Sequence, residues 1–207
     1  MRKACLLAVG IVCLLSVLSG CGRKASSGIG SKGSVFKIGV VLPFSGSLAA
    51  FGEEGKQGID LAVQQVAKTL GKGRTATVIY EDSKGDPAET VRGFKKLADV
   101  DKVDVIIGEV ASNNTLAIAP IADQQRIPLV VPASTNAGIT QGKHYVMRVC
   151  FLDPQQGSAM AQYARRKLGI RKVAILCDKG NDYSFGLAEA FKQSFSAAGG
   201  QVLGETY

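Results

Sequence analysis

The chain has 207 residues, 46% of them hydrophobic and 20% charged, which is the composition of an ordinary globular protein with room for one large or two small domains. Its formal net charge is +8, but the basic residues are spread along the sequence and form no stripe interleaved with aromatic residues. Because zinc-finger and helix-turn-helix signatures are also missing from the sequence, we expect no binding to nucleic acid.

The N-terminus has the pattern of an export signal. Two basic residues precede an apolar run, Cys5 to Leu18, that is too short to span a membrane comfortably and leads into LSGC at residues 18–21. Small residues before a cysteine resemble the lipobox of bacterial lipoproteins, so we expect cleavage before Cys21 and a diacylglycerol on its thiol. The alternative is an uncleaved anchoring helix, but the glycines on either side of Cys21 disfavour a helix there. Either reading places the rest of the chain outside the cytoplasm.

Residues 22–34 (GRKASSGIGSKGS) are glycine, serine and lysine with little to bury, which is typical of a flexible tether. Within them Gly28, Gly30 and Gly33 spell GxGxxG, a pattern found in dinucleotide sites. That fingerprint must follow a strand and open a helix, whereas here it precedes the first predicted strand. We interpret it as a chance match and expect no cofactor.

Two cysteines, Cys150 and Cys177, lie in the globular part of the chain. Each falls within or at the end of a predicted buried strand, which favours free buried thiols, although a disulfide is open to them in an oxidising compartment. The sequence has no CxxC motif and a single histidine, His144, so we expect no metal site.

From residue 36 onward, apolar strands alternate with amphipathic helices. We expect strands at 36–42, 77–80, 103–107, 127–131 and 145–149, with helices at 51–70, at 86–98 and from about 112. After residue 149 the pattern begins again, with a helix at 153–168, a buried strand at 172–177, a helix at 185–198 and a strand at 201–207. This alternation predicts an α/β fold with parallel sheets and right-handed crossovers.

Helical spacing also predicts which side chains face inward. We expect these to be Ile59, Ala62, Val63, Val66 and Leu70 in the first helix, Val91, Phe94 and Leu97 in the second, and Ala159, Met160, Tyr163, Ala164 and Leu168 in the helix at 153–168. The sequence stops on a strand, which would leave backbone groups unpaired and an apolar face uncovered. We therefore expect it to be incomplete.

The segment from Val103 to Thr140 carries the strongest indication of a site. It is predicted as strand, loop, helix, strand and loop, and both loops follow apolar strands and contain small hydroxyl residues. In open α/β sheets, ligands bind at the carboxyl ends of the strands. We therefore interpret this segment as half of a binding site.

Three blocks of the sequence carry a family resemblance. In chain order they are KIGVVLPFSGSLAAFGEEGKQGIDLAV, GEVASNNTLAIAPIADQQRIPLVVPASTNAGIT and VAILCDKGNDYSFGLAEAF. Together they resemble the branched-chain amino-acid binding proteins of bacterial ABC importers, which have the type I periplasmic-binding-protein fold, and the resemblance extends from about residue 36 to 207. It implies two doubly wound α/β lobes that close over a ligand by a hinge motion.

The resemblance implies a division of the chain and a set of partners. Residues 1–20 would be the lipoprotein signal peptide, 21–34 the lipidated tether, 35–149 most of lobe one and 150–207 the start of lobe two, with both lobes incomplete. The partners would be a branched-chain amino acid or similar small zwitterion, the permease and ATPase subunits of an ABC importer, and a membrane through the lipid.

The resemblance also implies a set of ligand-binding residues. Ser112 matches the serine that holds the ligand carboxylate together with nearby backbone N–H groups. Thr135 matches a threonine that contacts the polar head of the ligand, and Ala133 matches the position whose backbone carbonyl accepts from the ammonium group. Tyr183 matches a tyrosine that reaches across from lobe two, and Phe51 replaces a tyrosine at the mouth of the cleft, which puts a polar contact there in doubt. From the residues alone, Ser112 could equally be a helix N-cap, the positions near Thr135 an ordinary strand-end loop, and Tyr183 a surface aromatic.

The acidic partner of the ligand ammonium would lie beyond Tyr207. Because an ammonium group buried without a counter-charge is unfavourable, we predict that residues 22–207 alone bind amino acids weakly or not at all. Submillimolar binding in a calorimeter would contradict this.

Two other functional classes fit parts of the sequence. An extracytoplasmic enzyme could use Ser45, Ser112 or Ser134 as nucleophile, but His144 has no obvious partner and no GxSxG motif is present. A sensor of the same fold would read a ligand and signal to a membrane partner without transport. Neighbouring permease and ATPase genes would favour import, whereas a histidine kinase or chemoreceptor gene would favour sensing.

Overall fold

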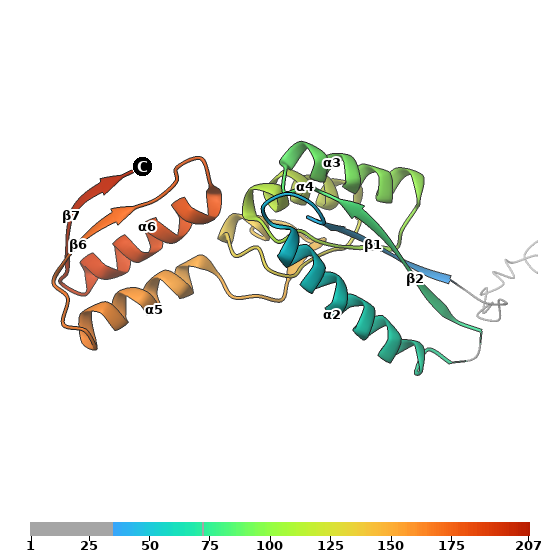
Figure 1. Ribbon diagram of the computed structural model, residues 1–207, viewed down its shortest axis with the longest axis horizontal. Coiled ribbons are helices and arrows are strands. Elements are labelled where there is room, and N and C mark those ends of the chain that lie inside the picture. Colours follow the sequence, from blue (N-terminus) through green and yellow to red (C-terminus); the bar gives the residue numbers. More distant parts are fainter. Residues whose placement is uncertain (1–34, 72) are drawn as a thin grey trace, which may run out of the picture. The chain divides into compact units, whose positions relative to one another are not determined.

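The computed structural model describes residues 35–71 and 73–207. The predicted signal peptide, Cys21 and the glycine-rich tether lie outside these residues. Within them the strands form a five-stranded sheet and a two-stranded sheet, and all paired strands are parallel (Figure 1). The predicted α/β fold with parallel sheets is confirmed.

The larger sheet has the strand order β2-β1-β3-β4-β5. Its strands are β1 (Val35–Leu42), β2 (Thr75–Asp82), β3 (Val105–Ile107), β4 (Leu129–Val131) and β5 (Val146–Arg148). The chain runs from β1 outward to β2 and then returns to β3 on the other side of β1, so the direction of winding reverses between β1 and β3. At such a switch point, the carboxyl ends of neighbouring strands form a crevice suited to a ligand.

The helices of this part lie on both faces of the sheet. They are α2 (Ala49–Ala67), α3 (Pro87–Lys95) continued by the π-helical turn η1 (Lys96–Val100), α4 (Ser112–Gln125) and the short 3₁₀ helix η2 (Ala137–Ile139). Figure 1 shows α3 and α4 on one face and α2 on the other. The core lies on the α3–α4 face, where Phe94 and Leu97 are fully buried, as the helical spacing predicts.

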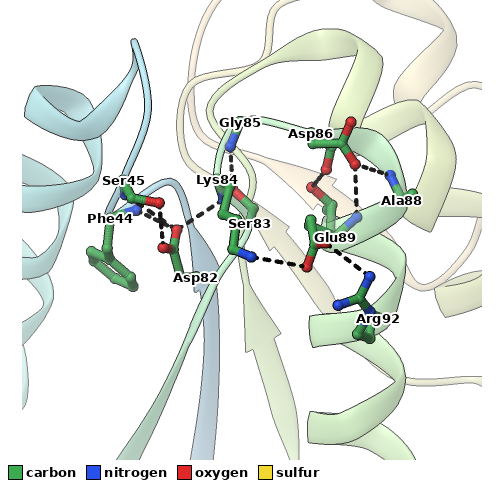
Figure 2. Close-up of polar contacts among 11 residues, drawn as sticks. Phe44, Ser45, Asp82, Ser83, Lys84, Gly85, Asp86, Ala88, Glu89 and Arg92 are labelled. Atoms are coloured by element: carbon green, nitrogen blue, oxygen red, sulfur yellow. Dashed lines mark hydrogen bonds and ion pairs between the residues drawn. The ribbon is translucent and has the colours of Figure 1, made fainter.

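The start of α3 follows directly from its sequence. Asp86 is the N-cap, and its carboxylate accepts hydrogen bonds from the backbone N–H groups of Ala88 at 2.8 Å and Glu89 at 3.0 Å (Figure 2). Pro87 occupies the first helical position, where its missing N–H would have had no partner in the helix. The predicted helix start at Asp86 and Pro87 is therefore confirmed.

The face predicted to point inward in α2 is its less exposed face, although it is only partly buried. The only buried residue of this helix is Gly52, while Ala62 and Val66 are exposed and the other predicted positions are half-buried. Gly52 lies on this same face, and the backbone approaches closely there, since a Cβ at residue 52 would lie 1.9 Å from the carbonyl oxygen of Pro43. The later turns are partly covered, because Ile59 and Val63 are half-buried and Asp60 accepts from the Tyr80 hydroxyl of β2.

The smaller sheet pairs β6 (Lys172–Leu176) with β7 (Gln201–Thr206), and α5 (Asp153–Arg166) packs against α6 (Asp182–Ala197). The inward face predicted for α5 is wrong for its large side chains, since Met160, Tyr163 and Leu168 are about half exposed, whereas Ala164 is half-buried. The buried positions are instead small residues, Gly157 and Ala161, because the α6 backbone lies so close that a Cβ at residue 157 would be 2.6 Å from the Phe191 nitrogen.

Several smaller expectations can also be compared with the structure. The strand β6 was expected to be buried, but its residues alternate between half-buried and exposed, and Leu176 is 80% exposed. Cys150 is half-buried and Cys177 is buried, and both thiols are free. Within residues 35–71 and 73–207, no helix is long and apolar enough to cross a membrane, and no cluster of three His, Cys, Asp or Glu side chains could hold a metal ion.

Candidate functional site

A pocket of about 390 Å³ lies at the carboxyl ends of β1, β3 and β4 and reaches the start of α6. Its lining consists of Leu48, Phe51, Val110, Ala111, Ser112, Ala133, Thr135, Phe151, Gln156, Asn181 and Tyr183. All five residues that the family resemblance singles out are therefore brought to one pocket. Their roles in binding a ligand stay predictions.

The N-terminus of α4 forms one wall of this pocket. Ser112 is the first residue of the helix and is 2% exposed, while the N-cap is Ala111, which has no capping side chain. The interpretation of Ser112 as an N-cap is therefore wrong. Among the described residues, no acceptor is present for the backbone N–H groups of Ser112, Asn113 and Asn114. Unpaired N–H groups and the positive end of the helix dipole make this wall suited to a carboxylate.

The loop that follows β4 forms the second wall and is held from two sides. The Arg148 guanidinium donates to the carbonyl oxygens of Ser134 at 3.0 Å and Asn136 at 2.9 Å. The backbone N–H of Asp153, at the start of α5, donates to the Thr135 carbonyl at 3.0 Å. These contacts fix the backbone of Thr135 at the pocket.

Asp153 is an acidic residue placed close behind this wall. It is 1% exposed, and burial raises the pKa of its carboxyl group, although the Thr135 hydroxyl and the Arg148 guanidinium act in the opposite direction. The group does not line the pocket.

The start of α6 supplies a third wall, which is tied to the first two by asparagine side chains. The Asn113 carboxamide accepts from the Asp182 N–H at 2.7 Å and donates to the Gly180 carbonyl at 3.0 Å. Asn136 donates to the Asp182 carbonyl at 3.0 Å. Tyr183, the next residue, is thereby held at the pocket with 39% of its surface exposed.

The loop after β1 carries Leu48, leads into the first turn of α2 with Phe51, and is fixed by Asp82 at the end of β2. The Asp82 carboxylate accepts from the N–H groups of Phe44 at 2.8 Å and Ser45 at 3.3 Å, and from the Ser45 hydroxyl at 2.6 Å (Figure 2). Burial alone would raise the pKa of Asp82, but the hydrogen bonds from Ser45, Lys84 and Phe44 outweigh it, so this pKa is lowered.

Sequence reasoning missed six of the lining residues: Leu48, Val110, Ala111, Phe151, Gln156 and Asn181. The first three are in the strand-end loops, so proximity to Phe51 and Ser112 could have indicated them. Asn181 is the N-cap of α6 and accepts from the N–H groups of Tyr183 and Ser184, but the helix was predicted to start at residue 185. For Phe151 and Gln156 no local pattern points to a site.

The lining combines neutral polar groups at one end with aromatic and aliphatic side chains elsewhere. Phe51, Phe151 and Tyr183 supply aromatic rings, Leu48 and Val110 add aliphatic surface, and no charged side chain belongs to the described lining. Such a pocket fits a small molecule that has a carboxylate at the α4 end and an apolar body.

Comparisons with known proteins agree with this geometry. Residues 35–207 match the family model described as "Periplasmic binding protein". Leu/Ile/Val-binding protein homolog 3 of Brucella melitensis is 31% identical over 188 residues, which cover 89% of this chain and 50% of that protein. The chain spans about half the length of the curated relatives it matches.

Solved structures give the same result. A leucine-binding protein, LivK, from Thermotoga maritima is 41% identical, with a TM-score of 0.78 over 83% of this chain and 49% of that one. LivJ from Streptococcus pneumoniae in complex with isoleucine is 31% identical, with a TM-score of 0.76 over 83% of this chain and 49% of that one. A solute-binding protein from Rhodopseudomonas palustris in complex with 3,4-dihydroxybenzoic acid is 32% identical, with a TM-score of 0.75 over 83% of this chain and 46% of that one.

The family of these proteins is one of solute-binding proteins and not of enzymes. With the match extending over every strand and helix from β1 to β7, this chain belongs to the periplasmic binding protein family.

Proposed function

We propose that this chain belongs to an extracytoplasmic substrate-binding protein that captures a small carboxylate ligand, of the branched-chain amino-acid class, for an ABC importer. The observation that carries the proposal is the gathering of Phe51, Ser112, Ala133, Thr135 and Tyr183 around one pocket at the switch point of the sheet. Relatives that bind leucine or isoleucine support the ligand class.

In this proposal the ligand carboxylate lies at the N-terminus of α4. It accepts from the Ser112 hydroxyl and from the unpaired N–H groups of the first helical turn, and each such charged hydrogen bond contributes about 1.5–3 kcal/mol. The Ala133 carbonyl and the Thr135 hydroxyl accept from the ligand ammonium. The side chain of the ligand packs against Phe51 and Tyr183.

The carboxylate is the common feature of the ligands found in relatives, which include an aromatic acid as well as amino acids. A wall suited to a carboxylate is compatible with ligands of such different bodies. Selection between an aliphatic and an aromatic body then depends on the apolar walls, to which Leu48, Val110 and Phe151 contribute here.

The remaining elements of the proposal concern where the protein works. Residues 1–20 direct export, Cys21 carries the lipid, and residues 21–34 connect the lipid to the ligand-binding part at the surface of a bacterial membrane. Residues 35–149 supply most of lobe one and residues 150–207 the start of lobe two. The permease and ATPase subunits of the importer are the expected partners.

A thermal-shift panel on residues 22–207 tests the ligand class. The panel compares leucine, isoleucine and valine with benzoate, and uses the methyl ester of leucine as the control that lacks a carboxylate. At a ligand concentration about four times the dissociation constant, the stabilisation is about 1 kcal/mol, or a rise in Tm of about 2–4 °C. A larger rise with the methyl ester than with leucine would contradict the proposed carboxylate site.

A further inference from the structure

A buried carboxyl group lies directly beneath the α4 wall of the pocket. Glu109 is fully buried, and it does not line the pocket. One carboxyl oxygen accepts from the Ser83 hydroxyl at 2.5 Å, and the other accepts from the backbone N–H of Ala111 at 2.8 Å. The side chain thus connects the carboxyl end of β2 to the N-cap of α4.

The backbone carbonyl of the same residue connects two further elements. It accepts from the Ser134 hydroxyl at 2.8 Å, and the oxygen of that hydroxyl is 2.6 Å from the Thr115 hydroxyl oxygen, which leaves the Thr115 proton to bridge the two. Ser134 belongs to the loop after β4, and Thr115 lies in the first turn of α4. All of the side chains in this network are fully or almost fully buried.

The network therefore reaches both polar walls of the pocket from behind. Val110, Ala111 and Ser112 follow Glu109 directly, while Ala133 and Thr135 flank Ser134, and all five line the pocket. Because the interior is close-packed, a change in the length or charge of the Glu109 hydrogen bonds is passed on to these backbone segments.

The charge of Glu109 is poorly compensated at this position. Burial raises the pKa of its carboxyl group, although the hydrogen bonds from Ala111 and Ser83 act in the opposite direction. The charged groups on the neighbouring elements are engaged elsewhere: Asp82 with the Phe44–Ser45 loop, Lys84 with Glu89, and Arg148 with the carbonyl oxygens of Ser134 and Asn136. Asp153, another acidic group, is itself buried, beyond the loop after β4.

We propose that Glu109 is a positioning residue that holds the two polar walls of the pocket in register, and that gain or loss of its proton changes how both walls present their N–H and hydroxyl groups. This inference rests on the proposed function, in which the ligand carboxylate binds at the N-terminus of α4. It adds that Glu109, which does not contact the ligand, controls the geometry of that end of the pocket.

An NMR pH titration of residues 22–207 without ligand tests this assignment. In the wild type, the Glu109 carboxyl carbon titrates above the ordinary value of 4.5. The amide signals of Val110, Ala111, Ser112 and Thr135 shift with the same midpoint. In Glu109→Gln these amide shifts disappear, because the side chain has no proton to lose: its carbonyl oxygen can accept from the Ala111 N–H and its NH2 group can donate to the Ser83 hydroxyl oxygen, as in the protonated glutamate. Glu53→Gln, which removes an exposed carboxylate on α2, is the matched control and should leave the shifts of these four amide signals unchanged.

The inference is overturned if Glu109 titrates at or below the ordinary value, if only Ala111 follows its titration, or if the amide shifts persist in Glu109→Gln. Because no ligand is present, such a failure would leave the proposed function standing. Conversely, if no ligand of the thermal-shift panel bound as proposed, the expected result of this NMR titration would be the same.

The pH dependence of Tm provides a second readout. A raised pKa means that the folded chain holds the Glu109 proton more tightly than the unfolded chain does. The stability from this group is therefore present at low pH and is lost as pH rises from the ordinary carboxyl value through the raised one. The difference in Tm between Glu109→Gln and wild type should thus rise with pH across this window, and a difference independent of pH would contradict the inference.

Discussion

At the level of single residues, three acidic side chains around the strand ends have different tasks. Asp86 caps a helix, Asp82 fixes a loop, and Glu109 lies buried between strand ends. The pKa shifts of the last two follow from this: hydrogen-bond donors lower the pKa of Asp82, whereas burial raises that of Glu109. Acidic residues of similar appearance in the sequence therefore acquire opposite responses to pH.

Asp82→Ala should loosen the loop after β1, which carries Leu48 and leads into α2. The substitution leaves the N–H groups of Phe44 and Ser45 without their acceptor, so we expect a loss of about 1–3 kcal/mol in the free energy of unfolding, measured by urea denaturation. Because the folded pKa is lowered, this stabilisation is present above the unfolded pKa and is lost as pH falls through the folded one.

Asp86→Ala is the matched control for Asp82→Ala. It removes the N-cap of α3 and should cost about 1 kcal/mol, with no change in the amide signals of the loop after β1. If Asp82→Ala left both stability and those signals unchanged, the role of Asp82 in fixing the loop would be disproved.

The candidate site could be predicted in part from single residues. The resemblance in three blocks of sequence indicated Phe51, Ser112, Ala133, Thr135 and Tyr183, which all line one pocket. It did not indicate Phe151 or Gln156, because the link after β5 and the first turn of α5 carry no motif of their own. Whether Ser112 caps α4 depended on the helix boundary, which sequence patterns fix only to within a few residues.

At the level of elements, the strands and helices were predicted in their order but not always in the face they bury. For α5, helical spacing of large apolar residues indicated the wrong side, whereas for α2 it indicated the right side but overestimated its burial. In both helices one buried position is a glycine, because the backbone of another segment comes too close for a side chain. A search for apolar side chains cannot detect a contact that is made by their absence.

Two of the three glycines of α2, Gly52 and Gly58, offer a direct test of this explanation. Gly58→Ala meets nothing within 4 Å, so it should raise the free energy of unfolding by about 0.5–1 kcal/mol through helix propensity alone. Gly52→Ala should instead lower it by about 1–3 kcal/mol, because the new Cβ collides with the Pro43 carbonyl. Similar effects of the two substitutions in urea denaturation would contradict the proposed close approach.

At the level of the whole molecule, the alternation of strands and helices was sufficient to predict the α/β class and the parallel sheets. The position of the site followed from a general rule, since the strand order reverses between β1 and β3 and the pocket lies at the carboxyl ends of the strands there. What the sequence could not predict was the set of contacts between distant segments, such as those of Asn113 with the loop before α6.

These contacts lead to a prediction for hydrogen exchange. Asn113→Ala removes the acceptor of the Asp182 N–H and the donor to the Gly180 carbonyl. The Asp182 amide should then exchange at least several-fold faster, while the amides of β1 and β3 keep their protection, because only a local opening is affected. Asn114→Ala, which changes the neighbouring asparagine, is the control. Equal effects of the two substitutions on the exchange rate of the Asp182 amide would argue against the Asn113 contact.

The central claim is that a ligand carboxylate binds at the N-terminus of α4, and an NMR titration of residues 22–207 with L-leucine tests it most directly. We predict a dissociation constant in the millimolar range or weaker, with shifts concentrated at residues 110–112 and 133–135. Ser112→Ala should weaken binding roughly tenfold or more, whereas Ser158→Ala on α5 should not. Shifts scattered away from the pocket, or equal affinity in the Ser112→Ala variant, would contradict the claim.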